Sequence, residues 1–379
     1  MSRWIVLIVS LCLGALGVGC TSDDDNGDPI GPTGPARSFS MGFTPFPYDD
    51  GFAPQDYVYD KIASHADIVC HHFDNGIPWP EALHNDNFHV NVMGDWQNRL
   101  GRTPAGHKML VTVTPIDIGR DTLAPYKAGL PDSPLPPPWD TYSFNHDSVK
   151  VAYVNYCERV IDFFDPDYLV IGIEVNLLIE ADTTLGKWND YLELQQHTYT
   201  ALKASKPSLP VFVSFTAMDL IDGYTDAHHS LQSAGFAQAM QYSDYCGLSF
   251  HPVISVFQAD SLPQQVIHDV LHLSNKPVVI TETSYPAEDF SILGGSIQFH
   301  GTPAKQEQFF ADLFATADSV DVGFIINFVI RDYDALWADL GSPDDIAKLW
   351  RDTGLWDEDG NERPVVTVWN EWLGRREDQ

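Results

Sequence analysis

The sequence predicts a single-domain α/β protein, a (β/α)8 TIM barrel that follows a signal peptide and a disordered tether. Eight short apolar segments alternate with longer segments of helical period, which is typical of parallel strands connected by helices. Residues 38–379 contain no second tether-like stretch, and they exceed the roughly 250 residues that such a barrel requires. We therefore assign residues 1–19 to the signal peptide, 20–37 to the tether and 38–379 to the barrel.

The first twenty residues predict export. Arg3 precedes an apolar run at 5–16, and small residues precede Cys20. This pattern is typical of a secretory signal peptide and is too short to span a bilayer as a mature helix. Cys20 resembles the cysteine of a bacterial lipobox, although Gly17 stands where leucine is usual. We expect Cys20 to carry a lipid that is the protein's one membrane contact, which makes the protein a lipoprotein at the bacterial outer membrane or cell surface. Release into the periplasm or medium is the alternative.

Composition excludes several classes of partner. Residues 21–27 are small and acidic and residues 31–35 are rich in glycine and proline, so they cannot bury apolar area and form the tether. The net charge of −32 repels nucleic acid and anionic lipid, which favours a neutral ligand. We also expect a monomer. The widely spaced Cys70, Cys157 and Cys246 are expected to be buried thiols.

The strand segments are runs of apolar residues, several of them nearly continuous, as in parallel strands that are buried on both faces. They lie at residues 38–44, 68–73, 108–114, 168–174, 211–216, 245–251, 277–283 and 323–328. An open, doubly wound sheet is the main alternative fold.

Helices are predicted between these strands from apolar residues at steps of three and four. They cover 153–164, 188–203, 264–273 and 304–317. Thr302 and Pro303 provide the last of them with a cap and a proline at its first position. The proline-rich segment 117–147 is a loop after the third strand, on the face where barrels build active sites.

Two strands end in glutamate after an apolar run, the fourth at Glu174 and the seventh at Glu282. Burial and a neighbouring carboxylate raise the pKa of one member of such a pair, so that one acid can donate a proton while the other is ionised. Retaining glycosidases need these two roles at a carboxyl separation of about 5–5.5 Å. A rim salt bridge or a loop anchor is the alternative for either residue alone.

Glutamates at the ends of strands 4 and 7 resemble those of clan A glycoside hydrolases, in which the first is the acid/base and the second the nucleophile. Residues 279–286 (VITETSYP) look like the nucleophile strand of the family 53 endo-β-1,4-galactanases. Residues 244–252 (DYCGLSFHP) resemble their sixth strand, and residues 354–364 (GLWDEDGNERP) their closing segment. The resemblance covers roughly the second half of the chain and implies catalysis by Glu174 and Glu282.

The sequence also departs from this family. Clan A enzymes carry asparagine immediately before the acid/base, where this chain has Ile173, and family 53 has an arginine motif where residues 70–75 read CHHFDN. Asn176 is a candidate substitute for the missing asparagine. Either the substrate differs from galactan, or the subsites are rearranged, or activity has been lost.

Other polar residues at strand ends are candidates for binding substrate. They are His251, Asn176, His72, Asp74, Asn327 and Tyr285. The resemblance implies that His251 orients the nucleophile. His71, His72 and Asp74 could instead bind a metal, but no partner cluster at metal spacing accompanies them, so we expect neither a metal nor a cofactor.

The remaining loop residues are ambiguous. Asp117 and Asp219 are loop anchors or ligands, and the loop aromatics either stack on sugar or pack in the core. Those aromatics are Trp79, Trp96, Trp139 and Trp337, with Tyr285 among them. The acidic residues Glu180, Asp182, Glu288 and Asp289 are most simply solvated loop charges.

The sequence as a whole favours a retaining β-glycosidase that hydrolyses O-glycosidic bonds of a neutral polysaccharide or oligosaccharide. Galactan is the first candidate substrate, followed by β-glucan and β-mannan. The rival hypotheses are a non-catalytic glycan-binding lipoprotein, which Ile173 favours, and an adhesive surface protein whose barrel is incidental.

Overall fold

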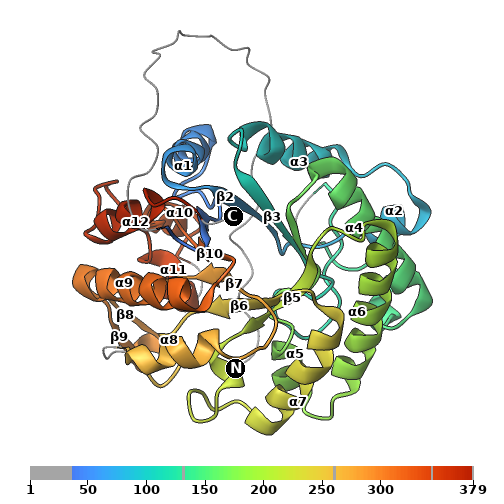
Figure 1. Ribbon diagram of the computed structural model, residues 1–379. Coiled ribbons are helices and arrows are strands. Elements are labelled where there is room, and N and C mark those ends of the chain that lie inside the picture. The colour runs from blue at the N-terminus through green and yellow to red at the C-terminus, as the bar shows by residue number, and fades with distance from the viewer. Residues whose placement is uncertain (1–35, 130–132, 259–261, 343–344, 378–379) are drawn as a thin grey trace.

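The computed structural model describes residues 36–129, 133–258, 262–342 and 345–377. Within them, eight parallel strands close into a barrel that helices surround (Figure 1). The order around the barrel is β1-β10-β7-β6-β5-β4-β3-β2. The strands are β1 (Ser40–Phe43), β2 (Ile68–Phe73), β3 (Lys108–Val113), β4 (Tyr168–Val170), β5 (Val211–Thr216), β6 (Cys246–Phe250), β7 (Val278–Thr283) and β10 (Phe324–Asn327). All eight predicted strands are present, and the (β/α)8 fold is confirmed.

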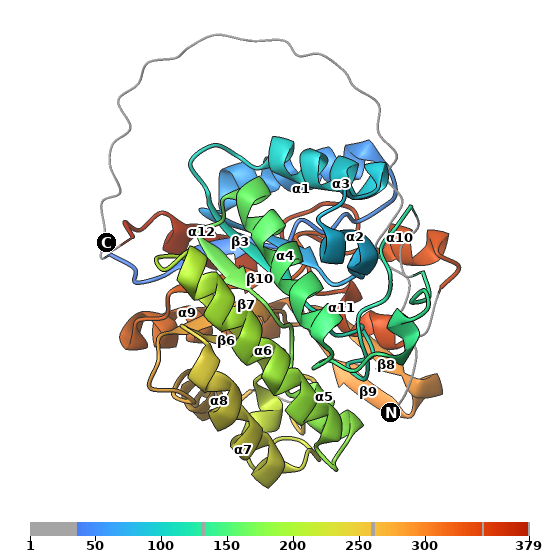
Figure 2. The same ribbon diagram turned by 90° about the vertical axis from the view of Figure 1, so that its right-hand side faces the viewer.

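The four helices that the periodicity predicts are confirmed as α4, α6, α8 and α9. The helices are α1 (Phe52–His65), α2 (Trp79–His84), α3 (Val90–Arg102), α4 (Asp147–Phe164), α5 (Leu177–Ala181), α6 (Gly186–Ser205), α7 (His229–Ala239), α8 (Gln264–Leu271), α9 (Pro303–Val320), α10 (Asp334–Asp339), α11 (Lys348–Arg351) and α12 (Val365–Leu373). Helix α9 begins as predicted, because the Thr302 side chain accepts a hydrogen bond from the Lys305 amide and Pro303 follows the cap. The short elements α2, α5, α10 and α11, which follow carboxyl ends of strands, lie on one side of the barrel, the right-hand side of Figure 2.

Side-chain direction in the strands decides which residues face the barrel interior. One apolar cluster lies inside the barrel. It consists of Ile68, Cys70, Leu110, Val170, Ile173, Phe212, Val279, Phe324 and Ile326. Successive side chains of a strand point to opposite faces, so Ile325 packs instead in the larger core between barrel and helices.

A bulge in β7 changes this alternation. Ile280 pairs with Leu248 of β6, whereas the next pair joins Ser249 to Glu282, so Thr281 is an extra residue on β7. Such a bulge re-aims the side chains that follow it. Thr281 and Glu282 consequently both line the interior pocket, although regular alternation would turn Glu282 toward the helices.

Strand β4 is shorter than the predicted segment 168–174. Its regular ladder ends at Val170, although the amide of Val175 still donates to Ser214 of β5 at 3.0 Å. Gly172 lies so close to α6 that an added Cβ would be 2.3 Å from the Tyr191 hydroxyl. Glu174 therefore lies four residues beyond the regular strand, and its backbone φ of 49° is left-handed.

The folded part of the chain begins before residue 38. Arg37, which we assigned to the tether, is buried, its amide donates to Arg376 O at 2.8 Å and its guanidinium pairs with Asp67 at 2.9 Å. The tether assignment is thus wrong at its last residue. The signal peptide, Cys20 and the tether up to residue 35 lie outside the described residues.

Two further expectations concern the membrane and the thiols. No helix among the described residues is both long and apolar enough to cross a bilayer. Cys70, Cys157 and Cys246 are buried free thiols, as predicted.

A hairpin that the sequence analysis missed lies between β7 and α9. Its strands β8 (Asp289–Ile292) and β9 (Ile297–His300) pair in antiparallel register. Phe290 and Phe299 stack across it with ring centroids 4.5 Å apart. The hairpin follows β7, so it belongs to the same end of the barrel as α10 and α11 (Figure 2).

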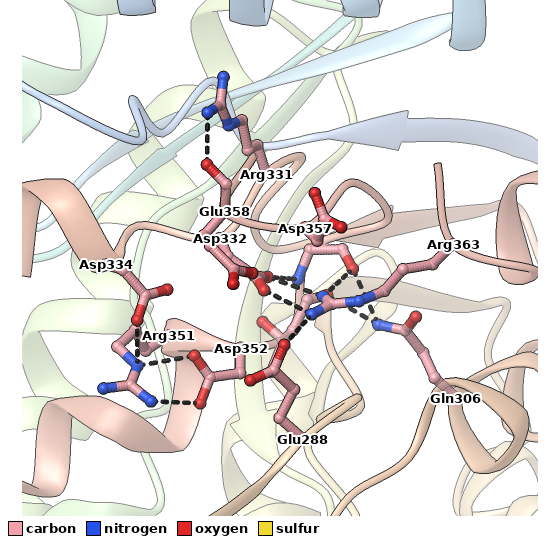
Figure 3. A network of polar contacts seen from close by, with 12 residues as sticks. Glu288, Gln306, Arg331, Asp332, Asp334, Arg351, Asp352, Asp357, Glu358 and Arg363 are labelled. Carbon is pink, nitrogen blue, oxygen red and sulfur yellow. Dashed lines mark hydrogen bonds and ion pairs between the residues drawn. The ribbon is translucent and has the colours of Figure 1, made fainter. Parts of the chain in front are cut away.

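A polar network fastens this end of the barrel to the C-terminal segment (Figure 3). Arg363 donates to both carboxylate oxygens of Asp332, at 2.9 and 2.6 Å, and to Glu288 at 2.7 Å. Asp332 also accepts from the Gly354 amide at 2.8 Å. Glu288, predicted to be a solvated loop charge, is therefore an ion-pair partner that joins the loop after β7 to the segment before α12.

Candidate active site

Glu282 lies near the end of β7 with two imidazoles beside it. Its Oε1 is 3.2 Å from Nε2 of His251, which follows β6, and its Oε2 is 3.8 Å from Nδ1 of His72 on β2. The Glu282 side chain is 13% exposed, so it is reached from solvent although most of its surface is covered. Two sequence-predicted residues, His251 and His72, are thus placed on Glu282.

Ser284 fixes the orientation of His251. Its hydroxyl lies 2.8 Å from Nδ1 of His251, and a hydroxyl that donates there leaves Nε2–H free to donate to Glu282. The His251 side chain is 5% exposed, and the ring of Trp350 meets it edge-on with centroids 6.0 Å apart. The imidazole is therefore held on three sides.

The two adjacent histidines of β2 point in opposite directions, as strand alternation requires. His71 is fully buried and its Nε2 lies 2.8 Å from the Thr103 hydroxyl. His72 faces the interior pocket with Glu282, and its Nε2 is 3.9 Å from Asp74. Because His71 and His72 diverge, they do not form a joint metal site.

Electrostatics at this position favour an ionised Glu282. Burial alone would raise the pKa of Glu282, but the hydrogen bond from His251 and the electrostatic interactions with His251 and His72 hold that pKa below its usual value, with Arg120 acting in the same direction. Burial opposes a charge on His72, yet its contacts with Asp74, Cys70 and Glu282 raise the pKa of His72 to about 10. At neutral pH His72 and Glu282 therefore form an imidazolium–carboxylate pair.

Glu174 contacts an arginine that the sequence analysis did not select. Arg120, from the loop after β3, donates through one nitrogen to Glu174 Oε2 at 3.2 Å. The same guanidinium grips Asp74 with two bonds, of 3.0 and 2.7 Å. Burial would raise the pKa of Asp74, but Arg120 and His72 hold it below its usual value.

Charged groups that lie within 4 Å of one another connect the two glutamates, and the two contacts of His72, at 3.9 and 3.8 Å, are longer than hydrogen bonds. The series runs from Glu174 through Arg120, Asp74 and His72 to Glu282. The interior pocket that His72 and Glu282 border is too small for a water molecule, and hydroxyl-bearing side chains and one apolar residue line the rest of it. Those residues are Thr112, Ser214, Ser249, Thr281 and Ile173.

Two predicted binding residues, Asn176 and Asn327, lie outside this series of contacts. Asn176 is fully buried, and its amide pairs with the backbone and hydroxyl of Thr216 and with Gln232. It therefore does not replace the asparagine missing at 173. Asn327 is also fully buried and donates to Val329 O at 2.8 Å. Asn327 lies two residues after Ile325 in β10 and so on the same face of the strand, the face toward the helices.

Tyr285 and most loop aromatics belong to the core. Tyr285 is 3% exposed and stacks on Phe309 of α9, with centroids 5.1 Å apart, so it is not a substrate platform. The buried indoles are Trp79, Trp96 and Trp139. Trp337 is partly exposed and packs with Trp350 in a small aromatic cluster around Phe46.

Loop aspartates act as anchors. Asp117 accepts the amides of Asp121 and Thr122, and Asp219 accepts the Thr216 hydroxyl at 2.9 Å. The carboxylates of Asp332, Asp334 and Asp352 lie within 4.8 Å of one another, which is close enough to share a metal. Arginines occupy that position instead, since Arg363 grips Asp332 and Arg351 grips Asp352 (Figure 3).

Sequence reasoning missed Arg120, Ser284 and Trp350. The one available signal for Arg120 was its place in the long loop after the third strand, which was expected at the active face. Ser284 lies two residues after Glu282, and Trp350 follows the eighth strand by more than twenty residues. The sequence positions of Ser284 and Trp350 do not indicate a contact with His251.

No protein-family model and no curated protein matches the chain. Solved structures do. The Ignisphaera aggregans family 53 glycoside hydrolase catalytic domain aligns at 13% identity and TM-score 0.56 over 84% of this chain and 88% of that one. A subfamily 18 member of family 5 from Streptomyces cattleya, in complex with GlcNAc, gives 14% identity and TM-score 0.60 over 90% and 81%.

A fungal β-1,4-galactanase structure adds a third likeness, at 16% identity and TM-score 0.51 over 84% of this chain and 91% of that one. Identities this low establish the fold and leave activity open. The chain shares its barrel fold with glycoside hydrolases of families 53 and 5.

Proposed function

We propose that this protein is a retaining β-glycosidase that uses Glu282 as nucleophile and Glu174 as acid/base. The observation that carries the proposal is the series of charged groups, each within 4 Å of the next, from Glu174 to Glu282 at the carboxyl end of a barrel shared with glycoside hydrolases. A pair of carboxylic acids around one substrate is the minimum equipment for retaining hydrolysis.

The proposed reaction proceeds by double displacement. A carboxylate oxygen of Glu282 attacks the anomeric carbon while the bond to the leaving oxygen breaks, and Glu174 gives its proton to that oxygen. Water then attacks the glycosyl–Glu282 ester, Glu174 takes the proton from the water, and Glu282 leaves as a carboxylate. The lowered pKa of Glu282 supports its role as the ionised partner.

The charges of the site support a neutral sugar as substrate. Arg120 is paired with Asp74 and Glu174, and His72 lies between Asp74 and Glu282. Both cations therefore face carboxylates of the protein, and neither is left to bind an acidic sugar. We propose a neutral β-linked polysaccharide or oligosaccharide, with galactan as the first candidate.

A panel of aryl β-glycosides and neutral polysaccharides tests the proposal with the wild type, Glu174→Gln and Glu282→Gln. We expect turnover by the wild type and losses of about 100- to 10,000-fold in each variant. The anomeric configuration of the first product, followed by NMR, must match that of the substrate. Background rates in all three proteins, or an inverted product, would refute the assignment.

A non-catalytic glycan binder is the second candidate function. Ile173 favours it, because this side chain is 3% exposed among apolar neighbours and offers no hydrogen bond to a sugar hydroxyl. A binder would retain polysaccharide affinity in calorimetry or a glycan array while showing no turnover, and the glutamine variants would bind as the wild type does.

We propose that the protein acts outside the cytoplasm, anchored through lipid on Cys20. Residues 1–20 support this through their signal-peptide pattern alone. Replacing Cys20 by serine should move the protein from the membrane fraction to the soluble fraction of expressing cells, and an unchanged membrane fraction would contradict the anchor.

A further inference from the structure

The loop after β3 contains a tight turn that presents Arg120 to the site. Asp117 organises this turn: its carboxylate accepts the amides of Asp121 and Thr122, at 2.8 and 2.9 Å, and its carbonyl accepts the amide of Arg120 at 2.9 Å. The Asp117 carbonyl also accepts a bond from the Arg120 guanidinium at 3.2 Å. The backbone thus fixes both ends of the arginine side chain.

The backbones of Arg120 and Glu174 are both left-handed, with φ of 53° and 49°. This conformation is uncommon for residues other than glycine, and it persists where the surroundings impose it. The other non-glycine examples lie at helix caps or turns; they are Asn85, Asp165, Leu185, Leu293, Asp321 and Ser342. Arg120 and Glu174 differ from them because they are partners in one ion pair.

The Arg120 guanidinium holds one carboxylate oxygen of Glu174, Oε2. The Arg120 side chain is 8% exposed, and Asp74, itself 11% exposed, takes two of its bonds. A planar guanidinium gripped by one carboxylate keeps a fixed orientation, so the nitrogen that reaches Glu174 Oε2 at 3.2 Å has a defined position. Ile173, next to Glu174 in sequence, provides no such bond.

We propose that Arg120 is the positioning residue for Glu174 in proton transfer to the leaving group. The inference rests on the proposed glycosidase function and deepens it. Arg120 acts through Glu174, and Asp74 acts through Arg120. Displacement of Glu174 would slow the step in which it protonates the leaving oxygen.

Leaving-group dependence tests this role, because protonation matters most for poor leaving groups. The variant Arg120→Lys keeps the positive charge but loses the planar guanidinium that donates two bonds to Asp74. We expect its kcat/KM to fall about 10- to 100-fold for a phenyl β-glycoside, as a misplaced catalytic group predicts, and to change little for the 2,4-dinitrophenyl β-glycoside. The sugar is the one that the wild type hydrolyses fastest.

Two further variants separate positioning from folding. Arg120→Gln combined with Asp74→Asn removes both buried charges together, so that Asp74 is not left as an unpaired carboxylate, and it should show the same dependence on the leaving group. Lys187→Gln breaks an exposed ion pair between the same loop and α6, at Asp121, and should leave kcat/KM unchanged for both substrates.

Equal losses with both leaving groups, or no loss, would overturn the positioning role while leaving the glycosidase assignment intact. Absence of hydrolysis by the wild type would instead refute the proposed function and this inference together. Circular dichroism and thermal unfolding of each variant confirm that the compared proteins are folded.

Discussion

The ion pair between Arg363 and Asp332 allows a stability prediction that is independent of activity. The Asp332 side chain has no exposed surface and that of Arg363 is 5% exposed. Burial raises the pKa of Asp332 to about 8. Above that pH, replacing Arg363 by methionine leaves a buried carboxylate without its arginine, a change that costs about 3–5 kcal/mol in unfolding free energy. Unfolding entropy near 60 °C is about 2.1 cal/mol/K per residue, or roughly 0.7 kcal/mol/K for this domain. The expected fall in Tm is therefore about 4–7 °C.

Differential scanning calorimetry of the folded domain measures this fall, with Arg102→Gln as the matched control. Arg102 pairs with Asp56, whose side chain is 58% exposed, and such surface pairs contribute about 0–1 kcal/mol. Adding Asp332→Asn to Arg363→Met should recover at least half of the lost Tm, because no buried charge then remains unpaired. Equal small shifts for Arg363→Met and the control would refute the reasoning.

Three other predictions follow from the site and its supports. The acid limb of kcat/KM should lie below pH 4.5, since the pKa of Glu282 is lowered and its ionised form is lost only as pH falls through that value; His72→Gln should move the limb upward in a pH–rate profile. Gly172→Ala should lower Tm by a few degrees, because its Cβ would meet the Tyr191 hydroxyl and overpacking costs about 1–3 kcal/mol; an unchanged Tm would contradict the close approach. Asn176→Ala should lower Tm and leave KM unchanged, as its amide pairs within the protein; a raised KM at constant Tm would restore it as a ligand.

The strands of this barrel were predictable because apolar runs of six or seven residues between helical segments leave few other folds. Helix α9 was predictable to within three residues at its C-terminal end, since Thr302 and Pro303 mark its start by local chemistry. The strands of the hairpin β8–β9 do alternate polar and apolar residues, but each has only four residues, the shortest run in which alternation indicates a strand.

Much of the site depends on facts that periodicity does not carry. The positions of His72 and His251 beside Glu282 were predictable because residues at the carboxyl ends of barrel strands face one cleft. The prediction that Asn327 binds substrate was wrong because in β10 Ile326 faces the barrel interior, so Asn327 faces the helices. The prediction for Tyr285 was wrong because α9 covers its ring. Arg120 is brought to Glu174 by a turn 54 residues away in sequence, a contact that only tertiary structure creates.

The extra residue in β7 has a consequence for tracing the ancestry of this protein. A comparison that scores each strand position by alternate burial would assign Glu282 to the helix-facing set and discard it as a reacting group. Distant homologues that lack the insertion at Thr281 would have to present their carboxylate from the neighbouring position, one step along the chain. Searches for such homologues should therefore accept an acidic residue at either phase of the seventh strand.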